Sequence, residues 1–361
     1  MTRIVIDARL AGHSGIGTYL SELLPRVVPQ LAQWRPLVLA TPARADALRA
    51  RLPADVRAWP VAPLSVADLL AVPPDVGSGD LLWTPHFNVP LRGRAALAVT
   101  LHDLLPLTEP ALAGRGRSLP VRAWLRAIEA RARVVLCVSA FTRGEALARS
   151  RLDAARVHVT PLGVDAAWSA SDAPPPAPGA TPTMIYVGLL KPHKNVHRLL
   201  RAFAGVRERI PHRLVLVARH RGVRNVDAQA LALARTLGDR VELVEALPFH
   251  ELVARVRAAQ FAVQPSLHEG FGLPALEAMA AGTPVLAGRA GALPEVCGDA
   301  ALYCDPASES DIAGALLRLA GDASLRAQLA GRGRIRARAF SWDACAEATA
   351  RALAAALNEP R

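Results

Sequence analysis

The sequence is almost without lysine. Only Lys191 and Lys194 occur in 361 residues, and the other 41 of the 43 basic residues are arginine. Aromatic residues make up 4% of the chain, and no apolar stretch approaches the roughly 18 residues that a membrane-spanning helix needs. The start "MTRIVIDARL" enters a strand-like run directly, which is not the pattern of a signal peptide. We therefore expect a cytoplasmic protein, at most peripheral on the inner face of the plasma membrane.

Cysteine is scarce as well. The four cysteines form no C-x-x-C pair and have no histidine at a zinc-site spacing, so we expect buried, reduced thiols. The net charge of +12 favours an acidic partner, but the arginines are spread along the chain without a basic block. This spread argues against nucleic acid as a partner. A non-catalytic basic module for anionic lipid or nucleic acid remains the alternative to an enzyme.

The chain alternates short β-branched runs with longer helical patterns, which predicts parallel sheets covered by helices on both faces. A chain of this length is too long for one ordinary core. We expect thirteen strands, seven in the first half and six in the second. They are "RIVIDA", "PLVLAT", "VRAWPVA", "LLWTP", "LAVTLHD", "VVLCVSA", "VHVTPLG", "MIYVGLL", "RLVLVA", "VELVEA", "FAVQPS", "PVLAG" and "ALYCDP".

A stretch rich in proline and alanine separates the two halves. It holds four prolines within six residues, which can continue neither a helix nor a central strand. The last segment is an alanine-rich helix with Ser341 as its predicted N-cap. We predict an N-terminal domain over 1–165, a linker over 166–183, a second domain over 184–340 and a C-terminal helix over 341–361.

The two lysines lie in "LLKPHKNVH", between a buried strand and a helix that we expect to begin after Asn195, its predicted N-cap. In open α/β sheets ligands bind at the carboxyl ends of the strands, and a helix N-terminus there favours an anion. Lysine supplies a compact point charge suited to a phosphate oxygen. The alternative to a phosphate-binding role is that two exposed loop lysines occur here by chance. Because the chain has no other lysine, a function is favoured.

A second segment, "HEGFGLPALEAMAAGTPV", follows another predicted strand. Its glycines allow close approach of a ligand, and Pro274 suits the first turn of a helix. Glu269 lies in the loop and Glu277 on the helix. The two carboxylates could form an acid/base pair, a metal site or acceptors for sugar hydroxyls, and a solvated surface glutamate is the alternative for Glu277.

These segments, with "YVGLLKPHKN" and "ALPEVCGDAALYCDP", resemble the retaining nucleotide-sugar glycosyltransferases of family 4. The resemblance covers nearly the whole chain. It implies the GT-B fold: two facing Rossmann-like domains, an active-site cleft between them, and a C-terminal helix that can return to the N-terminal domain. "DAR" followed by "GIGTY" and "PHKN" is most similar to the branch of bacterial mannosyltransferases of polysaccharide and O-antigen assembly.

The resemblance implies a role for each residue of the second half. Glu269 would hold hydroxyls of the donor sugar, Glu277 would accept hydrogen bonds from the ribose, and Lys194 would stabilise charge on the leaving diphosphate. Backbone amides would meet the sugar and the diphosphate from the loop residues Gly270, Phe271, Gly272 and Leu273. The chain has no D-x-D manganese motif, so we expect no metal and no other cofactor.

One position departs from the family pattern. Many relatives place an arginine directly after the glycine at the strand end, as a second clamp on the phosphates, and this chain has Leu189 there. Lys191 or His193 could compensate, or Arg219 could reach in. Which group supplies the second phosphate cation stays open.

In the N-terminal half, Gly15 and Gly17 match the family loop that approaches the donor, and His102 matches a histidine near the site of transfer. Read alone, the glycine pattern is a weak dinucleotide signal, and a histidine that ends a strand is more often structural. Asp103 could orient the imidazole or cap a turn.

We predict transfer of a sugar, with mannose from GDP-mannose the best single choice, to a glycan or lipid-linked glycan in cell-surface polysaccharide assembly. Rhamnose and glucose donors are the alternatives within the family, and an epimerase on the same fold is disfavoured. No second carboxylate stands out as a nucleophile, so we expect retention through same-face transfer. The segment 118–135 reads as a basic amphipathic helix with Arg122, Arg126, Arg131 and Arg133, able to rest on anionic lipid; an ordinary domain helix is the alternative.

Overall fold

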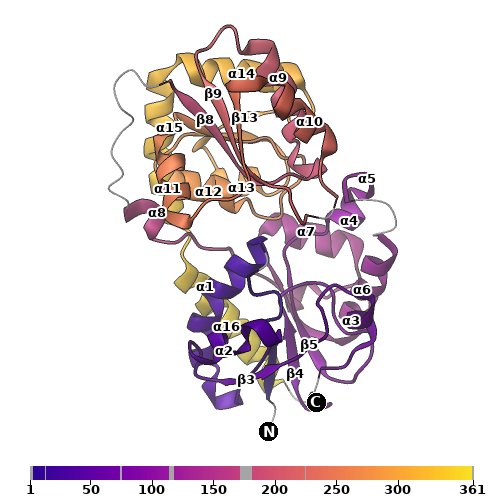
Figure 1. Ribbon diagram of the computed structural model, residues 1–361. Coiled ribbons are helices and arrows are strands. Elements are labelled where there is room, and N and C mark those ends of the chain that lie inside the picture. The colour runs from indigo at the N-terminus through magenta and orange to yellow at the C-terminus, as the bar shows by residue number, and fades with distance from the viewer. Residues whose placement is uncertain are drawn as a thin grey trace. The chain divides into compact units, whose positions relative to one another are not determined.

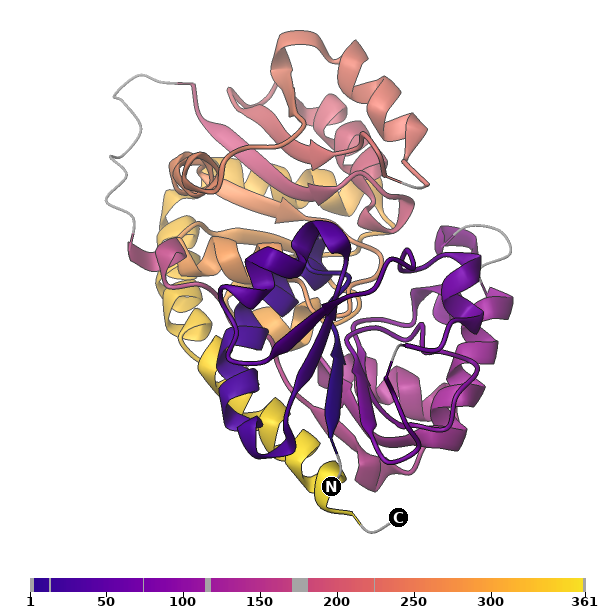
Figure 2. The same cartoon turned by 60° about the horizontal axis from the view of Figure 1, so that its bottom comes forward.

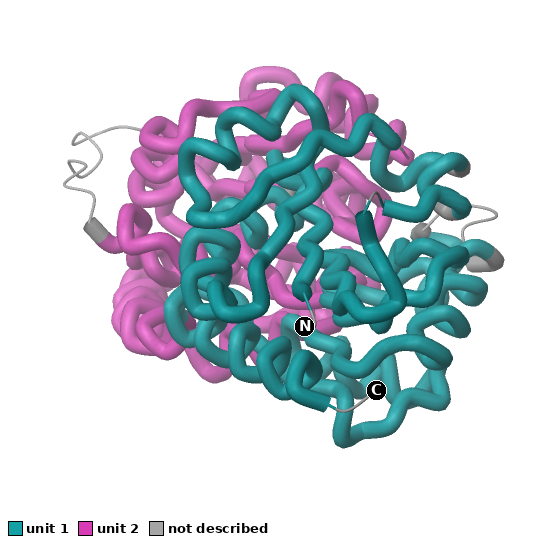
Figure 3. Tube along the Cα trace, turned by 90° about the horizontal axis from the view of Figure 1, so that it is seen from below, with its two compact units in different colours: residues 1–163, 341–361 teal, residues 164–340 magenta. Residues whose placement is uncertain are grey.

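The computed structural model describes residues 3–12, 14–73, 75–113, 118–170, 181–223 and 225–359. The chain forms two compact units (Figure 3): unit 1 comprises residues 1–163 and 341–361, and unit 2 comprises residues 164–340. Each unit is built on one parallel sheet. The predicted α/β class, with two doubly wound domains, is therefore confirmed.

Unit 1 has a seven-stranded parallel sheet in the order β3-β2-β1-β4-β5-β6-β7. Its central strands are apolar on both faces because helices cover both, and β2 and β4 are buried along their whole length. The strands are β1 (Ile4–Asp7), β2 (Leu37–Ala40), β3 (Asp55–Ala58), β4 (Leu81–Thr84), β5 (Ala96–Leu101), β6 (Ala132–Cys137) and β7 (Val157–Val159).

The C-terminal helix α16 (Trp342–Asn358) belongs to unit 1, as predicted, and runs along α1 (Ser14–Gln30) in Figures 1 and 2. Ser341 caps it as expected, because its Oγ accepts a hydrogen bond from the amide of Ala344 at 3.0 Å. The other helices of this unit are α2 (Pro42–Arg49), α3 (Val66–Leu70), α4 (Leu105–Thr108), α5 (Pro110–Ala113), α6 (Ser118–Arg131) and α7 (Ala140–Arg149), with 3-10 helices at Ala32–Trp34 and Ala154–Arg156.

The span 118–135 predicted for the basic helix was too long. Helix α6 ends at Arg131, and β6 begins at the next residue, Ala132. Arg131 donates to the carbonyls of Pro90 (2.6 Å) and Ala95 (3.2 Å), so it binds the loop before β5. Arg133 lies in β6 and donates to carbonyls at the end of α16. Of the four arginines expected on the polar part of this helix, only Arg122 and Arg126 are exposed on α6.

Unit 2 has a six-stranded parallel sheet in the order β10-β9-β8-β11-β12-β13. With these six strands, all thirteen predicted strands are confirmed. They are β8 (Thr183–Leu189), β9 (Arg213–Arg219), β10 (Val241–Val244), β11 (Phe261–Gln264), β12 (Val285–Gly288) and β13 (Ala301–Cys304).

The helices of unit 2 include a short one inside the segment expected to be a linker. There Trp168 is 2% exposed and its ring contacts Phe249 edge-on, with centroids 5.6 Å apart. Residues 171–180 of that segment lie outside the described residues. The helices are α8 (Ala167–Ala170), α9 (Val196–Val206), α10 (Ala228–Thr236), α11 (Phe249–Ala258), α12 (Leu273–Ala280), α13 (Leu293–Cys297), α14 (Glu309–Gly321) and α15 (Ala323–Ala337), with 3-10 helices at Pro192–Lys194 and Gly238–Arg240.

The four cysteines are buried free thiols, as predicted: Cys137, Cys297, Cys304 and Cys345. Burial raises the pKa of each thiol to about 12, which keeps all four protonated and unreactive at neutral pH. Within the described ranges, no helix is both long and apolar enough to cross a bilayer.

Candidate functional site

The predicted donor residues lie on two loops at one edge of the unit 2 sheet. Strand β8 pairs with β9 on one side and with β11 on the other, so the strand order reverses between β8 and β11. In open α/β sheets such a reversal separates the loops at the carboxyl ends of the strands and leaves room for a ligand. The loop after β8 carries Lys191 and Lys194, and the loop after β11 carries Glu269.

Lys194 and Glu269 form an ion pair between these loops. The Nζ of Lys194 lies 2.7 Å from each carboxylate oxygen of Glu269, and Ser266 Oγ donates to Oε1 at 2.8 Å. The side chains are 17% and 9% exposed, so each charge compensates the other where water screens weakly. A ligand with a phosphate and hydroxyl groups could give each side chain a new partner: the phosphate would bind the Lys194 ammonium, and the hydroxyls would donate to the Glu269 carboxylate.

Asn195 fixes the first loop to the second. Its backbone is left-handed (φ 61°), its side chain is fully buried, and its Nδ2 donates to the carbonyls of Pro265 (2.9 Å) and Pro306 (2.6 Å). We expected Asn195 to cap α9; it occupies the N-cap position, but its side chain makes no capping hydrogen bond. A further bond, from the Leu267 amide to the His193 carbonyl at 2.8 Å, ties the same loops.

The loop before α12 is shaped by two glycines. Gly272 has φ 104° and forms the N-cap of α12, and Pro274 lies in the first turn as predicted. Gly291 has φ 60°, and a Cβ there would stand 2.5 Å from both the amide nitrogen and the carbonyl oxygen of Glu269. Only glycine therefore fits at position 291. The loop residues Gly270, Phe271, Gly272 and Leu273 lead directly from Glu269 into α12, and Phe271 is buried against Phe340.

Glu277 lies on α12 and is half-buried. Burial, and after it the charge of Asp165, raises the pKa of its carboxyl to about 7. Among the described residues its carboxyl has no hydrogen-bond or ion-pair partner, in contrast to that of Glu269. Hydroxyl donors from a ligand would favour the ionised form.

The second phosphate cation has two candidates in this unit. Arg219 is the last residue of β9 and pairs in register with Leu189, the position where relatives have arginine. Its side chain is exposed, and in the described part of the chain its guanidinium has no partner. Lys191 precedes the turn at Pro192–Lys194 and is half-buried. His193 carries no charge here, because burial, then Lys194, Lys191 and His268, lowers its pKa to about 2.

In unit 1 the strand order reverses between β1 and β4. Gly15 and Gly17, expected in a loop, lie instead in the first turn of α1. A Cβ on Gly17 would stand 2.8 Å from backbone atoms of Gly12, so this glycine lets the helix pack on the preceding turn. Gly15 is exposed and has open space where a Cβ would be.

His102 directly follows β5. Its Nε2 donates to the Pro85 carbonyl at 3.0 Å, which leaves Nδ1 with the lone pair, and its ring meets Tyr19 edge-on at 4.9 Å. Burial, and then His86, lowers the pKa of His102 to about 4, so the ring is neutral at pH 7. Asp103 caps a turn, accepting from the Leu105 amide at 3.0 Å.

Within the described ranges, no group of three or more His, Cys, Asp or Glu side chains is arranged so that it could hold a metal ion. Lys191, Lys194, Arg219 and the amides at the start of α12 are positive groups that the described loops offer to an anion.

Ser266 and Gly291 were not predicted as site residues, and Asn195 ties two loops together where a helix cap was expected. Ser266 lies three residues before Glu269 and two residues after the end of β11, a position that indicates a polar residue at the sheet edge. The contact of Gly291 with the Glu269 backbone joins segments from different strands, and no local pattern reports it.

Two family models match the chain. "Glycosyltransferase Family 4" matches residues 15–168, and "Glycosyl transferases group 1" matches residues 170–336. The O-antigen chain mannosyltransferase B of Escherichia coli is 31% identical over 279 residues, covering 73% of this chain and 71% of that protein. The MMP alpha-(1->4)-mannosyltransferase of Mycolicibacterium hassiacum is 34% identical, over 70% of this chain and 64% of the relative. For the D-inositol 3-phosphate glycosyltransferase of Corynebacterium glutamicum, 35% identical, the match spans only 41% of the relative's length.

Solved structures with the same fold cover nearly the whole chain. Sucrose-phosphate synthase from Thermosynechococcus elongatus superimposes with a TM-score of 0.73 at 20% identity, over 98% of this chain and 99% of that one. Anabaena Alr3699/HepE, solved with UDP-glucose, gives a TM-score of 0.75 at 18% identity, over 98% and 100%. At these identities the likeness is one of fold. Together with the relatives above, it places this chain in glycosyltransferase family 4, with the GT-B fold of two Rossmann-like domains.

Proposed function

We propose that the protein is a retaining glycosyltransferase that moves mannose from GDP-mannose to a glycan or lipid-linked glycan acceptor in cell-surface polysaccharide assembly. The observation that carries the proposal is the Lys194–Glu269 pair at the strand-order reversal of unit 2, with both contacts at 2.7 Å. The choice of mannose is supported by the two relatives named as mannosyltransferases.

Each side chain has a chemical task in this proposal. Lys194 meets the diphosphate and stabilises the charge that builds on it as the glycosidic bond breaks. Glu269 accepts hydrogen bonds from the sugar hydroxyls, and Glu277 accepts them from the ribose. Arg219 or Lys191 supplies a second positive charge, and backbone amides from Gly270 to Leu273 bind the sugar and the phosphate. In unit 1, Gly15 and Gly17 approach the donor and His102 acts in the transfer step.

Retention follows, in the proposal, from what Glu269 is able to do. Its carboxylate accepts hydrogen bonds from Lys194 and Ser266, which lowers its nucleophilicity. Retaining glycosidases use a free second carboxylate to form a covalent intermediate. We infer instead that the departing phosphate accepts the proton of the acceptor hydroxyl, so that the new bond forms on the face from which the nucleotide leaves.

Membrane contact enters the proposal only as a way to reach a lipid-linked acceptor. Arg122 and Arg126, exposed on α6, supply two positive charges for it. Sedimentation with anionic liposomes tests this point. Recovery in the pellet at low salt is expected, and absence from the pellet at every salt concentration would remove membrane contact from the proposal.

Substitution of the ion pair tests the function itself. We expect Glu269→Ala and Lys194→Ala to lower turnover of GDP-mannose about 10²- to 10³-fold, the loss typical of one transition-state contact. Removing Lys194 leaves a buried carboxylate unpaired, at a cost of about 3 kcal/mol in stability, so circular dichroism must confirm folding. The double variant Lys194→Met/Glu269→Gln leaves no unpaired charge and keeps the fold. Near-normal turnover in folded variants would refute the site.

A further inference from the structure

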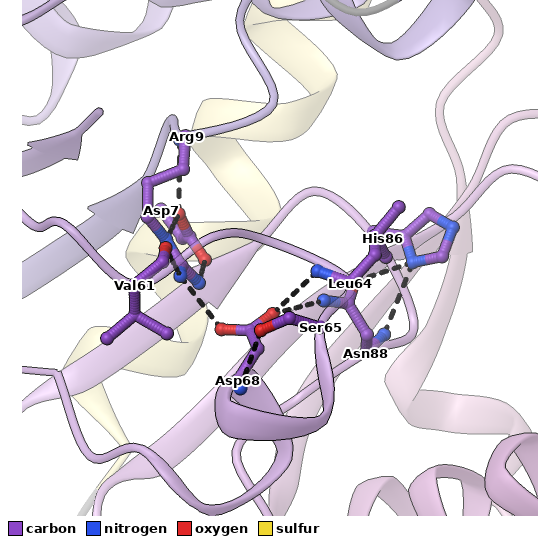
Figure 4. Close-up of polar contacts among 8 residues, drawn as sticks. All are labelled: Asp7, Arg9, Val61, Leu64, Ser65, Asp68, His86 and Asn88. Carbon is purple, nitrogen blue, oxygen red and sulfur yellow. Dashed lines mark hydrogen bonds and ion pairs between the residues drawn. The ribbon is translucent and has the colours of Figure 1, made fainter. Parts of the chain in front are cut away.

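A chain of polar contacts in unit 1 was not anticipated from the sequence (Figure 4). His86 Nδ1 lies 2.6 Å from Asn88 Oδ1, and Asn88 Nδ2 donates to Asp68 Oδ2 at 2.9 Å. Asp68 Oδ1 pairs with the Arg9 guanidinium at 2.8 Å, which also pairs with Asp7 at 2.6 Å. Arg9, Asp68 and Asn88 are 2%, 6% and 8% exposed, so these three residues form the buried part of a continuous hydrogen-bonded network that runs from His86 to Asp7.

The network fixes the orientation of Asn88. Asp68 Oδ1 pairs with the Arg9 guanidinium, and Oδ2 accepts from the Leu64 amide. A carboxylate only accepts hydrogen bonds, so Asn88 must present its NH₂ group to Oδ2. Its amide oxygen then faces His86. Arg9 itself is held in place, because its guanidinium lies 3.6 Å above the Trp59 ring and donates to the Val61 carbonyl at 2.8 Å.

The orientation of Asn88 fixes the tautomer of His86. An amide oxygen can only accept, so a contact of 2.6 Å requires a proton on His86 Nδ1. The Asn88 backbone amide also approaches this nitrogen, but at 3.3 Å, which is the weaker contact. Burial lowers the pKa of His86 more than Asp103, Asn88 and Asp68 raise it, so the ring is neutral. Its Nε2 therefore carries a lone pair.

Nothing in the described part of unit 1 uses that lone pair. The ring of His86 is only half-buried, and in Figure 4 its second nitrogen lies on the side away from the dashed contacts. A neutral nitrogen held in one orientation at an accessible position is suited to accept a hydrogen bond from a ligand.

His86 lies in a loop at the edge of the sheet where ligands bind in open α/β folds. His86 follows β4, and Arg9 follows β1, the two strands between which the strand order of unit 1 reverses. The preceding residue, Pro85, accepts the hydrogen bond from His102 at 3.0 Å. His86 is thus linked directly to the histidine that we assign to the transfer step.

The charges of the network indicate the class of ligand. Two carboxylates, Asp7 and Asp68, face one guanidinium, and Asp103 adds a further negative charge near the ring. A phosphate would be repelled here, whereas a neutral hydroxyl can donate to Nε2. We propose that His86 Nε2 binds a hydroxyl of the saccharide acceptor, with Asn88, Asp68 and Arg9 as positioning residues. This inference rests on the proposed function, because it assumes transfer to a saccharide.

The tautomer can be measured on the full chain without any substrate. In nitrogen-15 NMR of protein labelled at histidine, with the signal assigned by its loss in His86→Asn, we expect a protonated Nδ1 and an unprotonated Nε2 at pH 7. Replacing Asn88 by Leu should abolish this preference. A protonated Nε2 in the wild type would overturn the inference, whatever the enzyme proves to catalyse.

Kinetics with GDP-mannose and methyl α-mannoside test the acceptor role. His86→Asn keeps a donor toward Asn88 but loses the distal acceptor, whereas His86→Gln keeps a distal oxygen. We expect His86→Asn to raise the acceptor KM at least tenfold with little change in donor KM, and His86→Gln to raise it less. His158→Asn, at an exposed position of β7, is the matched control and should behave as wild type.

Each outcome of this experiment decides something. An unchanged acceptor KM in His86→Asn, or a donor KM that rises by the same factor, would overturn the acceptor role. A wild-type protein that does not turn over GDP-mannose would contradict the proposed function instead. In that case the tautomer alone decides the inference: a lone pair on Nε2 supports a hydroxyl site at His86, and a proton on it rejects the site.

Discussion

The carboxyl groups of Glu269 and Glu277 differ in their partners. Glu269 has Lys194 and Ser266 within 2.8 Å, whereas burial and Asp165 raise the pKa of Glu277 to about 7. In the unfolded chain a glutamate titrates near its ordinary value, so the folded form binds the extra proton between about pH 4.5 and 7. Glu277 therefore lowers stability as pH rises through this window.

Donor binding should depend on the protonation of Glu277. If ribose hydroxyls bind the carboxylate, only the ionised fraction is competent, and this fraction rises about tenfold from pH 6 to pH 8 for a pKa near 7. We expect the affinity for GDP-mannose, measured calorimetrically, to rise by about that factor. The sugar nucleotide has no phosphate that titrates in this range.

Two variants control this measurement. Glu277→Gln should flatten the pH dependence, and Asp165→Asn should shift it to lower pH, because Asp165 is the charge that contributes to the raised pKa. Parallel pH profiles in wild type and Glu277→Gln would show that another group titrates.

Arg219 and Arg221 offer a matched pair for the second phosphate cation. Arg219 pairs with Leu189 in the sheet, whereas Arg221 is exposed two residues later and lies 3.9 Å from Glu245. We expect Arg219→Ala to raise the donor KM about tenfold, the effect of losing one charge-assisted contact, and Arg221→Ala to leave it unchanged. Equal effects of both would reduce Arg219 to a contributor of general positive charge and shift the assignment to Lys191.

At the residue scale, the sequence predicted which residues carry useful chemistry better than it predicted which residues contact each other. The rarity of lysine and the spacing of Glu269 and Glu277 pointed to the residues that we predict to bind the donor. The pairing of Lys194 with Glu269 was not predicted, because it joins positions 75 residues apart. The His86–Asn88–Asp68–Arg9 network was missed for the same reason: its members come from three separate segments.

At the scale of elements, Gly291 couples the loop before α13 to the loop before α12. Its left-handed backbone and the 2.5 Å approach to Glu269 leave no room for a Cβ. We expect Gly291→Ala to cost about 3 kcal/mol and to lower the thermal midpoint of unit 2 by about 6 to 12 °C. Donor affinity should fall with it, because the Glu269 backbone must move.

A glycine in a helix is the control for this prediction. Gly314 lies exposed in α14 with open space around its missing Cβ, so Gly314→Ala should stabilise the protein by about 1 kcal/mol. If Gly291→Ala were as stable as Gly314→Ala, the Glu269 loop would have to be far more adaptable than the close contact implies.

The hydrophobic pattern located all thirteen strands. The error at α6 arose because nothing in the sequence marks where this helix ends. No glycine or proline separates the helix from β6, so the regular arginines concealed the change at Arg131. Asn195 was read as a helix cap from its type, but tertiary partners at Pro265 and Pro306 took its side chain.

At the scale of the whole molecule, the two parallel sheets share one feature of their strand order. In each unit the strand order reverses once, beside β1 in unit 1 and beside β8 in unit 2, and the polar residues of interest lie on the loops after the reversing strands. Alternating strands and helices predicted two parallel sheets, but the order of strands within a sheet depends on pairings between distant segments. Hence the sequence could name candidate residues but could not place them.

Hydrolysis of GDP-mannose, followed by proton NMR from the first seconds, tests the central claim most directly because it needs no acceptor. We expect the wild type to release GDP and to form α-mannose first, with the rate reduced at least 100-fold in Lys194→Met/Glu269→Gln and unchanged in Arg221→Ala. First formation of β-mannose would contradict retention. Equal rates in wild type and the double variant would contradict the assignment of the donor site to Lys194 and Glu269.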